Sequence, residues 1–180
     1  GDDAMRYIDN IQDSSRRMQQ LISALLAYSR ITTQGRSFVE TDLNDVLTQA
    51  ISDLDWAVEE AKAHLEVGPL PLIEADPIQM RQLLQNLLSN ALKYSRPGVP
   101  SEVKISGRVL EEGETFSGFS SGQNSTALGY CEITMADNGI GFDEKYLDRI
   151  FKVFQRLHGP DEFAGTGVGL AIVRRAVEGI

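Results

Sequence analysis

Helical and strand-like patterns alternate along residues 37–180, and this order constrains the fold more than any other feature of the sequence. Asp76 followed by Pro77 is a typical helix start, because the carboxylate can cap free N–H groups and proline fits the first turn. Strands are expected at residues 37–41, 64–67, 70–74, 103–110 and 130–136, and helices after Asp42, at 77–94, at 144–154 and after the glycines at 165–169. Short strands interleaved with helices predict an α/β two-layer sandwich.

The apolar pattern of residues 1–33 predicts one long helix. Apolar and small side chains recur along it in steps of three and four, at Ile8, Ile11, Ser15, Met18, Ile22, Leu25 and Ser29. This 3.5-residue repeat favours a coiled-coil-like helix in a dimer or bundle, while a lone helix packed on its own domain stays possible. The polar residues 32–36 form the expected linker, so the predicted domains are 1–33 and 37–180. Residues 111–129, rich in glycine and serine, are expected to be a surface loop that joins a strand hairpin.

Composition excludes several classes of function. The net charge of -9 argues against a nucleic-acid partner, because no basic face stands out to neutralise phosphates. The single cysteine, Cys131, excludes a disulfide framework and a cysteine-based zinc site, and a packed thiol is expected there. No apolar run approaches the roughly 20 residues of a membrane span. A soluble, cytoplasmic chain without membrane contact is therefore expected.

The helix at 77–94 carries a polar row beside its apolar face. Asn86, Asn90 and Lys93 are spaced at i, i+4 and i+7, so they share one side of the helix. The buried face is expected to hold Met80, Leu84, Leu87, Leu88 and Ala91. Two amides and an ammonium in one row can hold a hydrated cation and phosphate oxygens. A solvated polar edge with an incidental lysine is the alternative.

Two glycine-containing segments follow. Residues 137–141, Asp-Asn-Gly-Ile-Gly, either form a plain Asn-Gly turn or place Asp137 as a buried acceptor for an exocyclic amine, with glycines close to a flat ring. Residues 165–169, Gly-Thr-Gly-Val-Gly, lead into a helix whose free N–H groups suit anions. Their spacing matches neither a Rossmann fingerprint nor a Walker A loop.

In this order the three segments resemble the N, G1 and G2 boxes of sensor histidine kinases, members of the GHKL ATP-binding superfamily. Residues 150–156 resemble the F box of the same family, and residues 18–30 resemble the second helix of its dimerisation and phosphotransfer domain. The resemblance implies a histidine-kinase ATPase fold for residues 37–180. It also implies that residues 1–33 belong to the dimerisation domain.

The resemblance implies a role for each matching residue. Asn86 and Asn90 would hold Mg²⁺ on ATP, Lys93 would contact phosphate, and Tyr94 would pack near the ribose or adenine. Asp137 would accept the adenine amine. Residues 143–164 would form a lid with Phe151 and Phe154 as its hydrophobic hinge. The ATP-binding set is completed by Gly139, Gly141, Arg156, Gly165, Thr166, Gly167, Gly169 and Leu170. Arg156 would reach the γ-phosphate, or else be a solvated cation.

Asn86 favours a kinase over an ATPase. Hydrolytic members of the superfamily resemble one another in a glutamate at this position, which activates water, whereas an amide cannot act as a base near pH 7. The resemblance therefore implies phosphoryl transfer to a histidine and then to an aspartate of a response regulator receiver domain, within a homodimeric kinase. A nucleotide-binding scaffold or a GHKL ATPase is the alternative.

Neither histidine of the sequence matches the phosphoacceptor of the family. His64 lies in a strand-like segment and His158 lies in the expected lid, so structural or surface roles are expected for both. No catalytic residue is therefore expected within residues 1–180. The sequence also ends before the glycine-rich strand hairpin that the family usually places last, so a C-terminally truncated ATP-binding domain is expected.

Overall fold

The computed structural model describes residues 2–33, 38–110, 130–157, 159, 162–163 and 165–178, without some side chains of the first helix. The expected loop at 111–129, most of the expected linker, and His158 lie outside these residues. The chain divides into two compact units. One comprises residues 1–35 and 143–175, and the other comprises residues 36–142 and 176–180.

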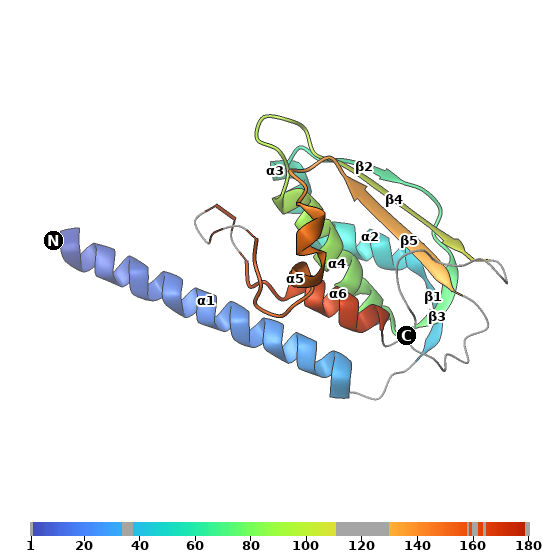
Figure 1. Cartoon of the computed structure of the whole chain (residues 1–180), viewed down its shortest axis with the longest axis horizontal. Coiled ribbons are helices and arrows are strands. Elements are labelled where there is room, and N and C mark those ends of the chain that lie inside the picture. Colours follow the sequence, from blue (N-terminus) through green and yellow to red (C-terminus); the bar gives the residue numbers. More distant parts are fainter. Residues whose placement is uncertain are drawn as a thin grey trace. The chain divides into compact units, whose positions relative to one another are not determined.

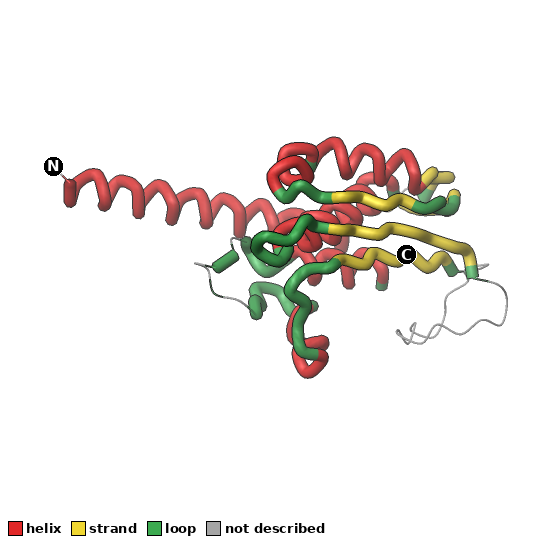
Figure 2. Tube along the Cα trace, turned by 90° about the horizontal axis from the view of Figure 1, so that it is seen from above, coloured by secondary structure: helices red, strands yellow, loops and turns green. Residues whose placement is uncertain are grey.

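The second unit is an α/β assembly, as the order of patterns predicts (Figure 1). Its elements are β1 (Val39–Asp42), α2 (Leu43–Asp53), α3 (Asp55–Glu60), β2 (His64–Val67), β3 (Leu72–Ala75), α4 (Pro77–Lys93), β4 (Glu102–Val109) and β5 (Cys131–Asp137). Among the described residues, β2, β4 and β5 form a three-stranded sheet in that order, seen as adjacent yellow strands in Figure 2. β4 pairs with β2 in parallel and with β5 in antiparallel orientation, and β1 pairs with β3 in a separate antiparallel ribbon.

Both predicted helix starts in this unit are confirmed. The Asp42 carboxylate accepts the N–H of Asn44 at 2.8 Å, and that of Asp76 accepts the N–H of Ile78 at 2.9 Å. Each bond satisfies a donor that the first turn of a helix leaves free. The hydrogen bond from the Asn44 side chain is the main reason that the pKa of Asp42 lies below its usual value.

The helix after Asp42 is shorter than its apolar pattern predicts. The N–H of Leu54 donates to the carbonyl of Ile51 at 2.9 Å, so the last turn tightens and α2 ends before α3 begins. The apolar spacing predicts a buried face of Leu47, Ala50, Ile51, Leu54 and Val58, whereas the observed buried face of α2 lies earlier in the sequence. It consists of Leu43, Val46, Leu47 and Ala50, whereas Ile51, Leu54 and Val58 are only half-buried.

The core of the second unit is centred on α4. Figure 1 shows α2 and α4 on one face of the three-stranded sheet. Val103 and Ile105 of β4 are buried, whereas the intervening Lys104 is exposed, which is the period-two pattern of a sheet with one covered face. The buried face of α4 is wider than predicted, since Leu83 and Leu92 join it and Leu87 is only half-buried.

The first unit contains α1 (Asp2–Thr33), the 3₁₀ turn η1 (Glu144–Tyr146), α5 (Leu147–Ile150) and the start of α6 (Gly169–Val177). Val168 and Ile172 form a small buried cluster, against which Ala24 of α1 and Val153 pack. The predicted seam residues Ile8, Ile11, Met18, Ile22 and Leu25 are all at least half exposed in this single chain. The coiled-coil partner of this seam stays a prediction. No helix within the described residues combines the length and apolar character needed to cross a membrane.

Two substitutions on α4 test where its core lies. Leu88 is fully buried and Ile78 is 78% exposed, although both are large aliphatic residues of the same helix. We expect Leu88→Ala to lower the free energy of unfolding by about 2–5 kcal/mol, because it removes apolar contacts and leaves a cavity. Ile78→Ala should change it by less than about 0.5 kcal/mol. Urea unfolding followed by circular dichroism measures both, and equal effects would contradict this placement of the core.

Candidate functional site

The polar row predicted on α4 lies along the edge of its buried face. Asn86, Asn90 and Lys93 are each half-buried. The Asn86 amide nitrogen donates to the carbonyl of Gln82 at 2.8 Å, one turn back on the same helix. This bond orients the amide so that its oxygen is the group presented to a ligand. An amide oxygen is a hard ligand of the kind that Mg²⁺ accepts, so the donor set of this row fits a hydrated cation.

Lys93 and Tyr94 form a pair at the C-terminal end of α4. The Lys93 ammonium donates to the Tyr94 hydroxyl at 2.9 Å and lies 4.3 Å from the centroid of the Tyr94 ring. A cation placed over an aromatic face is attracted by the electrons of the ring. The pair therefore holds the ammonium beside the helix end.

The segment after β5 folds into a tight loop around Gly139. Oδ1 of Asp137 accepts the N–H of Gly139 at 2.8 Å. The Asp137 side chain is exposed, so the expectation of a buried acceptor is wrong. Within the described part of the chain, Oδ2 of its carboxylate makes no hydrogen bond. The Asn138 side chain accepts from the N–H of Glu102 and donates to the carbonyl of Pro100, which fixes the loop to the start of β4.

This loop is not the plain Asn-Gly hairpin turn. β5 pairs with β4, and the chain after Gly141 enters η1 instead of a strand that returns along β5. Gly141 has a φ of 64°, in the left-handed region that glycine adopts at little cost. The Asp137 carboxylate therefore lies at the start of an irregular loop, where a ligand can reach it.

Gly139 brings the loop against the end of α4. A Cβ atom at this position would lie 2.5 Å from the Tyr94 carbonyl oxygen and 2.7 Å from Oδ1 of Asp137. The N–H of Ile140 donates to that same Tyr94 carbonyl at 2.9 Å, and Nε of Arg96 donates to the Gly139 carbonyl at 2.9 Å. The structure thus places three predicted residues, Tyr94, Asp137 and Gly139, next to one another.

The residues that fix this loop were absent from the predicted site. These residues are Asn138 and Arg96, and neither belongs to the ATP-binding set that the resemblance implies. Nothing in their spacing indicates their partners, because both bonds join residues more than 35 positions apart. The hydrogen-bond partners of these residues can be identified only from the three-dimensional structure.

The other predicted glycines lie in the first unit. Gly167 has a φ of 71°, and its carbonyl accepts the N–H of Phe154 at 3.0 Å. A Cβ atom on Gly167 would lie 2.9 Å from the carbonyl oxygen of Gln155, so this turn packs closely on the segment before it. Gly165 is exposed, Thr166 and Leu170 are half-buried, and α6 begins at Gly169. The start of α6 offers free N–H groups to an anion.

Arg156 makes hydrogen bonds within the predicted lid, and Phe154 is exposed. The Arg156 guanidinium donates to the carbonyls of Gly159 and Phe163, so here it ties the backbone of the predicted lid together. Phe154 is 52% exposed, whereas a hydrophobic hinge would bury it. Phe151 is half-buried, with the Arg174 guanidinium 6.0 Å from its ring centroid.

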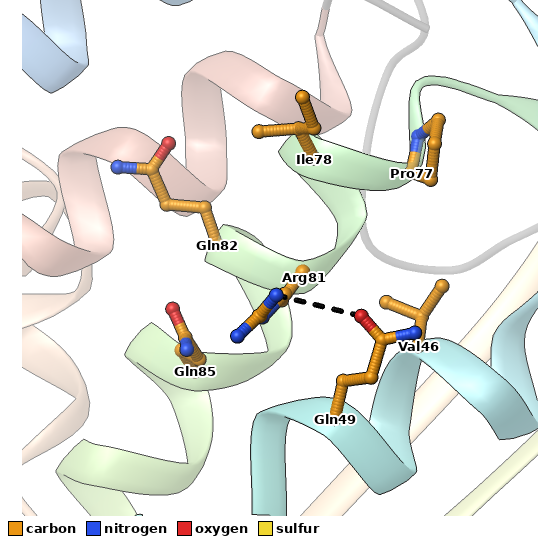
Figure 3. Close-up of a pocket in the computed structure, with 7 residues that line it drawn as sticks. All are labelled: Val46, Gln49, Pro77, Ile78, Arg81, Gln82 and Gln85. Carbon is orange, nitrogen blue, oxygen red and sulfur yellow. Dashed lines mark hydrogen bonds between the residues drawn. The ribbon is translucent and has the colours of Figure 1, made fainter. Parts of the chain in front are cut away.

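A shallow groove of about 550 Å³ lies between α2 and the first half of α4 (Figure 3). It contains none of the predicted site residues and is lined by Val46, Gln49, Pro77, Ile78, Arg81, Gln82 and Gln85. The Arg81 guanidinium makes two hydrogen bonds to the Asp53 carboxylate, at 2.6 and 2.7 Å, and also contacts Gln49. Its charge is already neutralised, so the groove offers no unpaired cation to an anionic ligand.

The described residues offer neither a reactive thiol nor a cluster of metal-binding side chains. Burial raises the pKa of the half-buried Cys131 thiol, so the thiol stays protonated at neutral pH, in agreement with a packed cysteine. Within the described residues, no three His, Cys, Asp or Glu side chains form a metal-binding group.

Sequence comparison identifies the family. The model of the histidine kinase-, DNA gyrase B- and HSP90-like ATPases matches residues 75–180, which include α4, the Asp137 loop and the glycine turn. The chain belongs to this family. It is similar to the phytochrome-like protein Cph1 of Synechocystis, with 36% identity over 99% of this chain. It is equally similar to cyanobacterial phytochrome A of Nostoc, with 36% identity over 98% of this chain. The chain spans 21% of the length of each of these two relatives.

Solved structures, among them histidine kinases, share the fold. The mycobacterial sensor histidine kinase MprB matches with a TM-score of 0.57 and 22% identity, over 78% of each chain. Full-length ShkA in complex with AMPPNP matches with a TM-score of 0.65 and 24% identity, over 96% of this chain and 33% of that one. The predicted α/β sandwich of the histidine-kinase ATPase type is therefore confirmed. Within the family, the chain is an ATP-binding domain of the histidine kinase kind.

The close packing around Gly139 can be tested directly. We expect Gly139→Ala to destabilise the second unit by roughly 1–3 kcal/mol, because the new methyl group overlaps the Tyr94 carbonyl and the loop must move. Gly68→Ala is the matched control, since the closest atom to its Cβ would be 3.4 Å away. Thermal unfolding compares the two variants. A Gly139→Ala protein as stable as Gly68→Ala would contradict the close approach.

Proposed function

We propose that this chain binds Mg·ATP and presents the γ-phosphoryl group to a histidine, from which it passes to an aspartate of a response regulator receiver domain. The observation that carries the proposal is the junction of α4 with the Asp137 loop. There a free carboxylate oxygen lies beside the end of the helix that bears two amides and an ammonium. This combination suits a ligand with a polar ring at one end and phosphates at the other.

Asp137 is proposed to recognise the adenine amine. Its Oδ1 is held by the Gly139 N–H, so the carboxylate keeps one orientation before a ligand arrives. Oδ2 is then the acceptor for the exocyclic amine. At Gly141 a Cβ atom would meet nothing within 4 Å, so this backbone gives the flat base room to approach, and the Tyr94 ring is proposed to pack near the ribose or adenine. Gly139 is buried against the Tyr94 carbonyl and shapes the loop.

Asn86 and Asn90 are proposed to hold Mg²⁺ through their amide oxygens, and Lys93 is proposed to contact phosphate. When bound, Mg²⁺ neutralises charge on the triphosphate and fixes its orientation. Lys93 must leave the Tyr94 ring to reach a phosphate oxygen. In the first unit, Gly165, Thr166, Gly167, Gly169 and Leu170 are proposed to contact the phosphates through backbone N–H groups, with Arg156 as a further cation.

Asn86 decides between transfer and hydrolysis in this proposal. An amide cannot take a proton from water near pH 7, so a nucleophile other than water is required. His64 is exposed on β2, an outer strand of the sheet among the described residues, and is not proposed for this role. We place the phosphoacceptor on a dimerisation domain, to which residues 1–33 contribute the second helix, while residues 37–180 form the catalytic domain of a homodimeric cytoplasmic kinase.

The base-recognition role of Asp137 has a direct test. We expect Asp137→Asn to weaken binding of ADP at least tenfold, because an acceptor in a charged hydrogen bond is replaced by an amide that must also satisfy the Gly139 N–H. Asp45→Asn, on the exposed side of α2, is the matched control and should leave the affinity unchanged. Isothermal titration calorimetry of the chain with Mg·ADP measures both. Unchanged affinity in Asp137→Asn would refute the assignment.

Phosphoryl transfer is tested by adding back the acceptor. The chain is mixed with γ-labelled ATP and a separately prepared dimerisation domain from a similar kinase, in its histidine form and in a His→Ala form. Label should appear on the histidine form alone, and Asn86→Ala with Asn90→Ala should abolish it by removing the metal ligands. ADP or ATP binding without transfer would instead favour a non-catalytic scaffold. Steady phosphate release by the chain alone would contradict the role given to Asn86.

A further inference from the structure

One peptide unit of the Asp137 loop is held at both ends. It joins Gly139 to Ile140, so it comprises the carbonyl of Gly139 and the N–H of Ile140. The N–H donates to the Tyr94 carbonyl at 2.9 Å, and the carbonyl accepts from Nε of Arg96 at 2.9 Å. Both partners follow α4 directly in sequence, so the end of this helix fixes the plane of the peptide.

One further hydrogen bond connects this peptide unit to the Asp137 carboxylate. Gly139 also donates its own N–H to Oδ1 of Asp137 at 2.8 Å. A rotation of the Gly139–Ile140 peptide turns the Gly139 backbone and moves the group that orients the carboxylate. Arg96, Gly139 and Asp137 are therefore linked in series.

Arg96 is the member of this series that a side-chain substitution can remove. The bond between Tyr94 and Ile140 is made by the backbone and survives any change at position 96. The Arg96 bond is made by a charged donor, and such bonds are stronger than neutral ones. The glycine at 139 makes the tie necessary, because a residue without a side chain restricts its own backbone least.

We propose that Arg96 is a positioning residue that determines the selectivity of the site for adenine, a proposal that rests on the base-recognition role of Asp137. Arg96 acts through the Gly139 carbonyl and not by contact with the base. Without it, the loop populates orientations in which the carboxylate is turned away. The apparent affinity for an adenine nucleotide then falls in proportion to the fraction of loops that stay competent.

The test compares nucleotides in Arg96→Ala, Arg96→Lys and an arginine control. The control is Arg108→Ala on β4, which removes the same charge from an exposed residue that pairs with Glu132. For each purified chain, the dissociation constants of Mg·ADP and Mg·GDP are measured by calorimetry. We expect Arg96→Ala to weaken ADP binding about tenfold and GDP binding by less than about twofold, so that the preference for adenine drops.

The lysine variant and the control separate positioning from general loss of structure. Arg96→Lys keeps a charged donor and should restore most of the adenine preference, while Arg108→Ala should match the unaltered chain. Equal weakening of ADP and GDP, or no change in either, would overturn the proposal. If Asp137→Asn abolishes ADP binding while Arg96→Ala does not alter it, only the role of Arg96 fails. If the unaltered chain binds no ADP, the proposed function fails and this inference fails with it.

Discussion

Burial of α4 is the constraint on which the second unit depends. Leu84 and Leu88 are fully buried, and they fix the rotation of the helix about its axis. Once that rotation is fixed, Asn86, Asn90 and Lys93 must lie at the edge of the buried stripe, because residues three and four apart share one side. The same helix therefore supplies the core and the polar row. Tyr94 and Arg96, which follow the helix in sequence, then anchor the Asp137 loop.

The order of helices and strands could be predicted because each element carries its own signal. Asp42 and Asp76 begin helices through local bonds to the first turn, and the first half of β4 alternates exposed and buried residues. The break at Leu54 could not be predicted in the same way. The apolar spacing continues through it, and only the bond from Leu54 to Ile51 shows that the helix ends there.

The candidate site was predictable in its residue types and only partly in its geometry. The spacing of Asn86, Asn90 and Lys93 depends on one helix, so it follows from sequence alone. The contact between Tyr94 and Gly139 depends on how β4 and β5 bring distant residues together, and no local pattern contains that information. The same limit applies to Arg156, because the spacing of residues in the sequence does not indicate that its guanidinium bonds to carbonyls within the lid.

Phe154 stores a small amount of conformational energy in the first unit. Its φ of 63° lies in the left-handed region, where a residue with a side chain is disfavoured by about 1–2 kcal/mol. The hydrogen bond from its N–H to Gly167 offsets this cost. The conformation of Phe154 and that of the Gly167 turn therefore depend on each other, because one backbone hydrogen bond joins the two residues. Loss of this bond would leave the left-handed backbone of Phe154 without its compensating contact.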